Sequence, residues 1–229
     1  LNLCSFSKSG ELPGKTSDIY QMFSASMLNP LPEDRKEFLS AMGLADEFTE
    51  EMAEFITKRE DVHQILKMLT RQNAFVTCLN DGQTYRFHHM MKECAFRAFR
   101  TLDDSRQAFY YERYGAWYEK HGAYIYALSA YRRNQNFAAI LRVVQKDAGI
   151  LLASLKPEEV LEVLNRCSVS VLKEYPLAIL VLMRCMFNWK NIPKMLELKE
   201  LLLASIREHP KLSEEERGNL LGECDLIQS

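Results

Sequence analysis

The chain has 229 residues, and 29 Lys and Arg side chains against 31 Asp and Glu give it a net charge of -2. This balance excludes a generally basic protein that coats nucleic acid, and it excludes a polyacidic tail. Glycine occurs only 9 times, about half the usual share of ~7% and fewer than the turns and phosphate loops of a nucleotide-binding α/β enzyme need. The composition therefore predicts a mainly α-helical protein. Because the first residue is Leu1 rather than Met, we expect the chain to be part of a longer protein.

The cysteines indicate a reducing compartment, and the hydropathy pattern indicates no membrane span. Six cysteines lie far apart with no Cys-x-x-Cys pair, which is typical of buried or incidental thiols. No signal peptide precedes the first predicted helix. The most apolar run, residues 177–187, is too short for the ~20 residues of a membrane span. We therefore expect a cytoplasmic protein without membrane contact.

The front of the chain predicts a loop followed by four helices. Residues 1–16 are rich in Ser, Gly and Pro, and they predict the loop. Capping residues and apolar spacing then predict the helices. They are a helix capped by Ser17 and Asp18, a helix over 33–42 that Gly43 ends, a helix capped by Thr49, and a helix that residues 61–64 open.

A β-hairpin follows these helices. Residues 75–79 and 84–87 are rich in β-branched and aromatic side chains, and the turn sequence of residues 80–83 separates them. The order of helices followed by a hairpin is that of a winged-helix domain, and another long helix comes after it. We therefore place a winged-helix-like domain with one small β-hairpin over residues 17–100.

Residues 101–229 read as helical throughout and predict TPR-like helical hairpin repeats. Four prolines (Pro157, Pro176, Pro193 and Pro210) mark helix starts, because proline is tolerated in the first turn of a helix. The predicted helices form pairs that recur about every 35 residues, the period of helical-hairpin repeats. The pairs are 104–121 with 123–133, 136–149 with 157–166, and 176–188 with 193–208. A capping box at residues 213–216 would open a further pair, so we expect a repeat domain that is truncated at its C-terminal end.

An aromatic run from Phe109 to Tyr118 has two interpretations. It could stack on nucleic-acid bases, or it could pack one helix of a hairpin on the next. The spacing favours packing, because Gly115 and Ala127 would let two helices approach while Tyr118 and Tyr131 fill the interface. The residues predicted to pack the repeats are Gly115, Trp117, Tyr118, Gly122, Ala127 and Tyr131.

Patterns typical of catalysis or metal binding are incomplete in this sequence. Residues 14–16 (Gly-Lys-Thr) match the end of a phosphate loop, but Ser9 stands at the first glycine position and Pro13 removes an N–H donor. Adjacent histidines on a helix point about 100° apart, so His88 and His89 are poor joint metal ligands. We expect one of them to pack under the hairpin and the other to be exposed. The sequence thus predicts neither a catalytic residue nor a metal site, and the chain is not expected to be an enzyme.

Direct DNA binding by the winged helix is a further interpretation. The third helix of the domain would read DNA, and it carries His63, Gln64, Lys67, Arg71, Gln72 and Asn73. Acidic residues outnumber basic ones over residues 17–100, and several of them crowd this helix. Such a surface repels phosphate, so a protein-facing winged helix is favoured.

Two stretches resemble a known family. Residues 85–90 (Tyr-Arg-Phe-His-His-Met) resemble a block of the MalT-like group of large ATP-dependent LuxR-type transcription regulators. Residues 103–133, with Trp117 and Gly122, resemble the start of the helical repeats in that family. The resemblance covers about residues 17–210. It departs from the family at Tyr126, where the family usually has Glu.

The resemblance implies a regulatory fragment of a signal-dependent transcription regulator. In that family an ATPase module precedes the winged helix, and a helical-repeat sensor and a DNA-binding helix-turn-helix follow it. An effector, either a small molecule or a protein, and ATP favour an active oligomer. Residues 1–16 would be the tail of the absent ATPase module, and ATP or ADP would bind the longer protein rather than this chain. His88 or His89, with Arg86, would touch the nucleotide. The alternative is a stand-alone TPR-like interaction adaptor whose winged helix could bind DNA.

Overall fold

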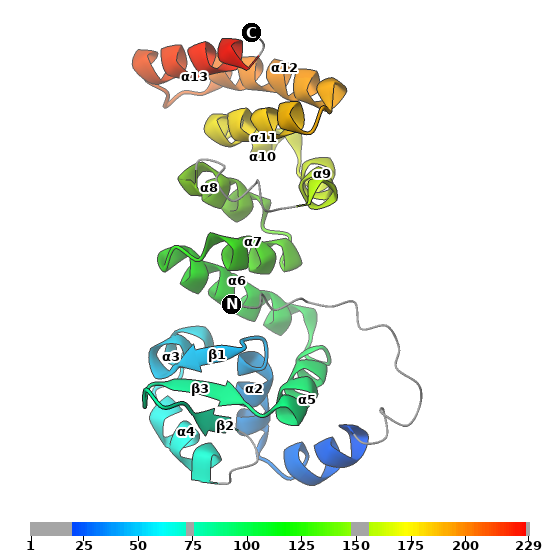
Figure 1. Cartoon of the computed structure of the whole chain (residues 1–229), viewed down its shortest axis with the longest axis vertical. Helices are drawn as coiled ribbons and strands as arrows, with labels where there is room; N and C mark the ends of the chain where they lie inside the picture. The colour runs from blue at the N-terminus through cyan, green and yellow to red at the C-terminus, as the bar shows by residue number, and fades with distance from the viewer. Residues whose placement is uncertain (1–19, 72–75, 148–155, 228–229) are drawn as a thin grey trace. The chain divides into compact units, whose positions relative to one another are not determined.

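The computed structural model describes residues 20–71, 76–147 and 156–227. The chain forms two compact units, residues 1–117 and residues 118–229 (Figure 1). Within the described residues, no helix combines the length and the apolar composition that a membrane span requires.

The first unit has the element order of a winged helix. Its elements are η1 (Ser24–Leu28), α2 (Glu33–Met42), β1 (Glu47–Thr49), α3 (Glu50–Thr57), α4 (Val62–Arg71), β2 (Val76–Cys78), β3 (Thr84–Phe87), α5 (His89–Phe99) and most of α6 (Asp104–Lys120). The predicted helices over 33–42, after Thr49 and from residue 62 are confirmed, and so is the hairpin. The predicted cap at Ser17 and Asp18 lies outside the described residues.

The structure adds a third strand that the sequence pattern did not predict. Strand β1 pairs antiparallel with β3, which also pairs with β2, so the sheet order is β1-β3-β2. Its three residues are too few to show the alternation that predicts a strand. Their last residue, Thr49, caps α3 by accepting a hydrogen bond from the Met52 N–H at 3.2 Å. The sequence around Thr49 therefore predicts the start of α3 rather than strand β1.

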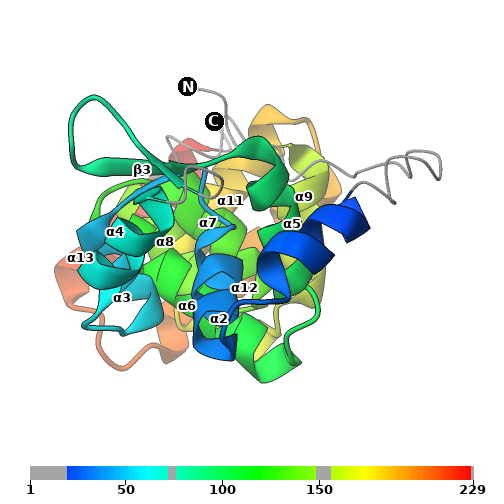
Figure 2. The same ribbon diagram turned by 90° about the horizontal axis from the view of Figure 1, so that it is seen from below.

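The hairpin turn is built by one aspartate and one glycine. The Asp81 carboxylate accepts hydrogen bonds from the Gln83 and Thr84 backbone N–H groups at 3.0 and 2.9 Å. Gly82 has φ +69°, a left-handed conformation that glycine adopts without steric cost. The loop between β2 and β3 projects away from α3 and α4 in Figure 2. It is the wing of the domain.

The core of the first unit lies between the sheet and its helices. The Phe48 ring lies 5.5 Å from that of Phe87 and 6.0 Å from that of Tyr85. Helices α2 and α5 pack so closely that a Cβ atom on Gly43 would lie 2.6 Å from the Cβ of Ala95. Gly43 ends α2 as predicted, but its φ is -62°, so close packing rather than a left-handed cap requires glycine there.

Helix α6 contributes most of its length to the first unit. The Tyr114 hydroxyl donates to the Ala41 carbonyl at 2.9 Å, and the Tyr110 hydroxyl donates to Glu37 at 2.9 Å. The Arg113 guanidinium donates to the carbonyl oxygens of Phe55 at 2.6 Å and Ile56 at 3.0 Å, which are orphan acceptors at the end of α3. The first compact unit therefore includes most of the helix that we predict to open the repeats.

The second unit consists of helices in the predicted order. They are α7 (Tyr124–Arg133), α8 (Phe137–Asp147), α9 (Pro157–Arg166), α10 (Val169–Lys173), α11 (Pro176–Asn188), α12 (Ile192–Glu208) and α13 (Glu214–Leu226). The short α10 was not predicted. Prolines stand in the first turn of α9, α11 and α12. The prediction for Pro210 was wrong, because it lies in the turn between α12 and α13, and Ser213 begins α13 with a capping box.

A buried carboxylate ties the last turn of α6 to α7 and α8. The side chain of Glu119, in the last turn of α6, is only 8% exposed. It accepts hydrogen bonds from the Tyr131 hydroxyl at 2.8 Å, from Arg142 at 2.8 Å and from Lys146 at 2.7 Å. The hydrogen bonds from Arg142, more than those from Lys146 and Tyr131, lower the pKa of Glu119 to about 2. Local sequence patterns did not predict this network.

Replacing Gly43 with Ala should destabilise the first unit by about 1–3 kcal/mol, because the added methyl group overpacks the α2–α5 contact. Urea unfolding measures the loss of free energy. In an A95G background, the same substitution should cost clearly less, since the clashing methyl group is gone. Equal costs in both backgrounds would show that another contact fixes Gly43.

Glu119→Gln should destabilise the second unit by about 2 kcal/mol at pH 7, a value discounted for the exposure of Arg142 and Lys146. The lowered pKa of Glu119 means that its stabilisation is full above about pH 4.5 and falls as the pH approaches 2. The difference in stability between the unmodified chain and the variant should thus be much smaller at pH 2.5 than at pH 7. Hydrogen exchange of α7 and α8 amides reports the difference.

Glu162→Gln provides the control, since its pair with Arg166 is half exposed and should change stability by less than about 0.5 kcal/mol. A Glu119→Gln effect that stays constant from pH 7 to pH 2.5 would contradict the account.

Candidate functional site

The predicted nucleotide-contact residues lie where β3 ends and α5 begins. Arg86 is in β3, His88 stands at the N-cap position of α5, and His89 is its first residue. Buried Phe87 anchors the strand end between them. Both histidines are exposed, so the expectation that one packs under the hairpin was wrong. His88 has φ -58° and ψ 141°, the extended backbone that is usual for a residue at the N-cap of a helix.

An acidic doublet, Asp46 and Glu47, lies beside these residues. Glu47 is directly opposite Arg86 in the β1–β3 register, and the Arg86 Nε donates to the Glu47 Oε1 at 3.1 Å. Lys92, whose backbone N–H bonds to the His88 carbonyl one turn back, forms an ion pair with Asp46. The cations on both sides of the histidine pair are therefore each matched by one acid of the doublet.

We call Arg86, His88, His89, Lys92 and the acidic doublet the histidine cluster. Sequence reasoning found three of its members and missed Lys92, Asp46 and Glu47. The doublet is distant in sequence, since Glu47 and Arg86 are 39 positions apart. No local pattern joins β1 to β3, so only the sheet register could have shown the pairing.

The histidine cluster is suited to an anion. Helix α5 has no acidic residue in its first turn and no side chain that caps its N-terminus. Its first backbone N–H groups and its dipole therefore favour negative charge. Imidazole, guanidinium and ammonium groups on the same exposed segment can donate hydrogen bonds to phosphate.

Metal and thiol chemistry have less support. No group of three or more His, Cys, Asp or Glu side chains placed to hold a metal ion occurs within residues 20–71, 76–147 and 156–227. The described cysteines are free thiols. Burial raises the pKa of Cys185 to about 11, so that thiol stays protonated at neutral pH.

The face of α4 that would read DNA is polar but flanked by acids. His63, Lys67 and Arg71 follow one another at four-residue spacing and are exposed together with Gln64. Glu50 lies 3.0 Å from the His63 ring, and exposed Glu51 and Glu54 line the preceding helix. Residues 72 and 73 lie outside the described residues, as do residues 14–16 of the incomplete phosphate loop. The arrangement places negative charge next to the face that a phosphate backbone would approach.

The predicted repeat-packing residues do not share one environment. Gly115, Ala127 and Tyr131 are buried in their helices. Tyr118 packs its ring against Tyr126 at 5.1 Å. Trp117 belongs to the first unit, where its ring lies 5.4 Å from that of Phe55. Gly122 has φ +70° and lies in the turn between α6 and α7.

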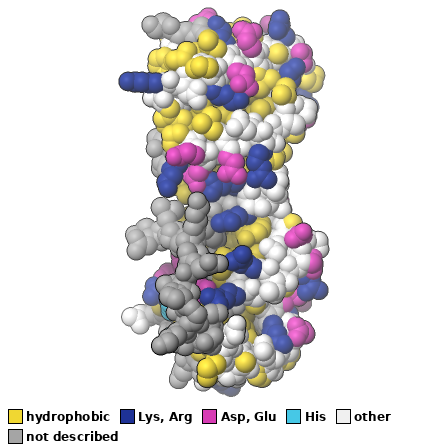
Figure 3. All heavy atoms as spheres, turned by 90° about the vertical axis from the view of Figure 1, so that its right-hand side faces the viewer, with side chains coloured by type: hydrophobic (Ala, Val, Ile, Leu, Met, Phe, Trp, Pro, Cys, Tyr) yellow, Lys and Arg dark blue, Asp and Glu magenta, His cyan; other side chains and the backbone are white. Residues whose placement is uncertain are grey.

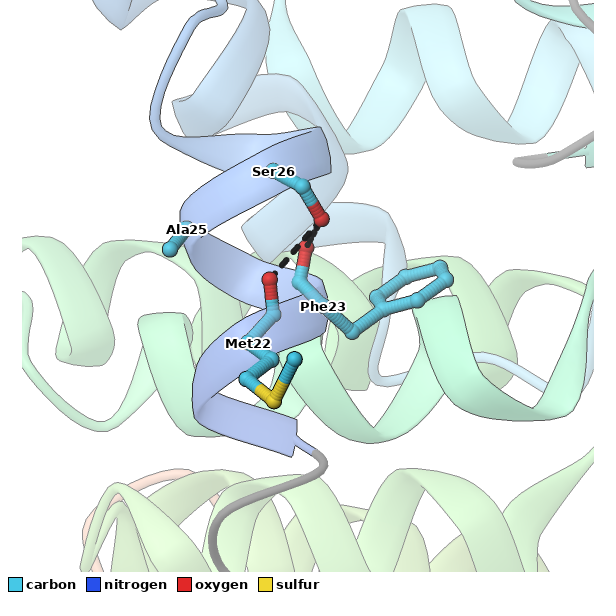
Figure 4. Close-up of a pocket in the computed structure, with 4 residues that line it drawn as sticks. All are labelled: Met22, Phe23, Ala25 and Ser26. Carbon is cyan, nitrogen blue, oxygen red and sulfur yellow. Dashed lines mark hydrogen bonds between the residues drawn. The ribbon is translucent and has the colours of Figure 1, made fainter.

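Two apolar surfaces lie outside the histidine cluster. Met22, Phe23, Ala25 and Ser26 line a shallow open hollow on η1 and the turn before it, where the Ser26 hydroxyl donates to the Met22 carbonyl at 2.8 Å (Figure 4). On the second unit, hydrophobic side chains reach the surface between charged ones (Figure 3). Leu226, in α13, is 68% exposed. Neither surface gathers groups suited to catalysis.

Comparisons with known proteins agree with the architecture of the first unit. Residues 24–109 match the family model of the MalT winged helix domain. A search of curated proteins found no match. This chain is similar to a solved structure from Pyrococcus horikoshii, a signal transduction ATPase with numerous domains and a tetratricopeptide repeat sensor. The sequence identity is 16% and the TM-score is 0.49. That similarity covers 96% of this chain, which spans about a third (34%) of the other. Residues 24–109 of the first unit are therefore similar to the MalT winged helix domain.

Proposed function

We propose that this chain is a regulatory part of a signal-dependent transcription regulator of the MalT-like LuxR type. In this proposal the winged helix couples the nucleotide state of an ATPase module, carried elsewhere in the longer protein, to a helical-repeat sensor. The observation that supports it is the MalT winged helix match over residues 24–109, followed in the same chain by helical hairpins. The chain itself would be no enzyme and would work in the cytoplasm.

Helix α6 gives the coupling a physical basis. It runs without interruption from Asp104 to Lys120. Arg113 and Tyr114 donate to backbone carbonyls of the first unit, whereas Glu119 binds side chains of the second. A helix is stiff over such a short span, so a shift at Arg113 should reach Glu119.

The histidine cluster is the proposed contact with nucleotide. Its exposed Arg86, His88 and His89 would face a phosphate of ATP or ADP held by the ATPase module. The cluster lacks a phosphate-binding loop of its own among the described residues, so the nucleotide would be held mainly by that module. This arrangement would make the contact sensitive to which nucleotide is bound.

The repeats are the proposed receiver of the signal. An effector, either a small molecule or a protein, would bind them and favour an active oligomer of the longer protein. DNA would be bound by a helix-turn-helix carried elsewhere, since acidic side chains flank α4 of the winged helix. The partners of this chain are then the other domains of its own protein together with the effector.

A second candidate is an adaptor that binds partner proteins through its repeats, with a winged helix that could bind DNA. The apolar side chains exposed on the second unit favour it, because mixed apolar and charged surfaces are typical of protein contacts.

The flanking gene sequence separates the two candidates. The regulator requires a Walker A motif upstream of this chain and a helix-turn-helix downstream. Reading the gene checks both at once. Finding neither would favour the adaptor.

Replacing His88 and His89 with Ala in the longer protein should weaken nucleotide binding about tenfold, because a charge-assisted hydrogen bond to phosphate is lost. Calorimetric titration with ADP measures the affinity. His63→Ala, at an exposed histidine on α4, is the matched control and should leave the affinity unchanged. Unchanged ADP affinity in the double variant would refute the proposed contact.

A further inference from the structure

The acidic doublet neutralises the cations that the histidine cluster would offer to a phosphate. Arg86 is 56% exposed and Glu47 is 42% exposed, so their ion pair lies at the surface rather than in the core. The pair between Lys92 and Asp46 is likewise open on its acidic side, where Asp46 is 50% exposed. Two adjacent residues thus hold both cations of one exposed cluster.

These two ion pairs contribute little to the stability of the fold. Exposed ion pairs typically contribute only about 0–1 kcal/mol to stability. The core of this unit includes Phe48 and Phe87, whose rings pack on each other at 5.5 Å. The carboxylates instead lie against the same guanidinium and ammonium groups that a phosphate oxygen would approach.

We propose that Asp46 and Glu47 act as a built-in competing anion at the histidine cluster. A phosphate group of a nucleotide or pyrophosphate binds Arg86 and Lys92 only by displacing the two carboxylates. This inference rests on the proposed nucleotide contact and adds its regulation. The cluster is held in a low-affinity state until a phosphate is delivered at high local concentration, as it would be by an adjoining nucleotide module.

The displacement has a second consequence for the sheet. Glu47 belongs to β1, and the neighbouring Thr49 caps α3. Release of Glu47 from Arg86 removes the ion pair that links the outer sides of β1 and β3. Anion binding at α5 is thereby coupled to the strand that leads into α3.

Titration of this chain with inorganic pyrophosphate tests the proposal. Chemical shifts of the α5 backbone amides and the histidine rings, followed by NMR at low salt, give the affinity. The variant with Asp46→Asn and Glu47→Gln should bind pyrophosphate about tenfold more tightly than the unmodified chain, since two nearby negative charges are removed. Adding Arg86→Gln to that variant should abolish the gain.

A variant with Glu51→Gln and Glu54→Gln is the matched control. It makes the same change in net charge on the exposed face of α3, and it should bind pyrophosphate as the unmodified chain does. Amide spectra and thermal melts confirm that each variant is folded. If one doublet substitution unfolds the chain, the other is tested alone.

Equal affinity of the doublet variant and the unmodified chain would overturn the proposal. An equal gain in the α3 control would also overturn it, because a general charge effect would then explain the result. The proposed function fails separately: unchanged ADP affinity of the histidine variant in the longer protein would refute that contact, whatever the pyrophosphate titration of this chain shows.

Discussion

The hydrogen bonds that α6 donates to backbone carbonyls are the contacts on which the first unit depends. Arg113 occupies acceptors at the end of α3, and Tyr114 reaches the Ala41 carbonyl in α2. Carbonyl groups at a helix end have no partner within the helix, and a buried one without a partner costs free energy. Burial lowers the pKa of Arg113, and the Phe55 ring, 4.6 Å from the guanidinium carbon, covers its charge. Because α6 satisfies these groups, its residues up to Trp117 are part of the first unit.

Charges are paired with opposite charges in both polar clusters, the Glu119 network and the histidine cluster. Glu119 is buried and matched by two cations and a hydroxyl, so it organises the start of the second unit. The histidine cluster lies at the surface, with Lys92 partly buried, and its two cations are matched by two acids. A buried network fixes structure because breaking it leaves an unpaired charge, whereas an exposed one can exchange partners at little cost. This difference is the physical reason for assigning structure to the first cluster and anion exchange to the second.

Local signals predicted most of the fold. Apolar spacing and caps such as Thr49 and Ser213 located the helices, and the turn sequence around Gly82 located the hairpin. What the sequence could not show depends on contacts between distant residues. Strand β1 exists because β3 pairs with it, and Gly43 is required by its approach to Ala95. The acidic doublet and the partners of Glu119 belong to the same class, so half of the histidine cluster appeared only in the structure.

The central claim is that nucleotide state reaches the repeats through the winged helix and α6. The most direct measurement is hydrogen exchange of the α6 amides in the longer protein, with ADP and then with a non-hydrolysable ATP analogue. The account predicts that protection of α6 changes between the two nucleotides, together with that of α5, where the histidine cluster lies. Identical protection of α6 in both states, while the ATPase module itself responds to the exchange of nucleotide, would contradict it.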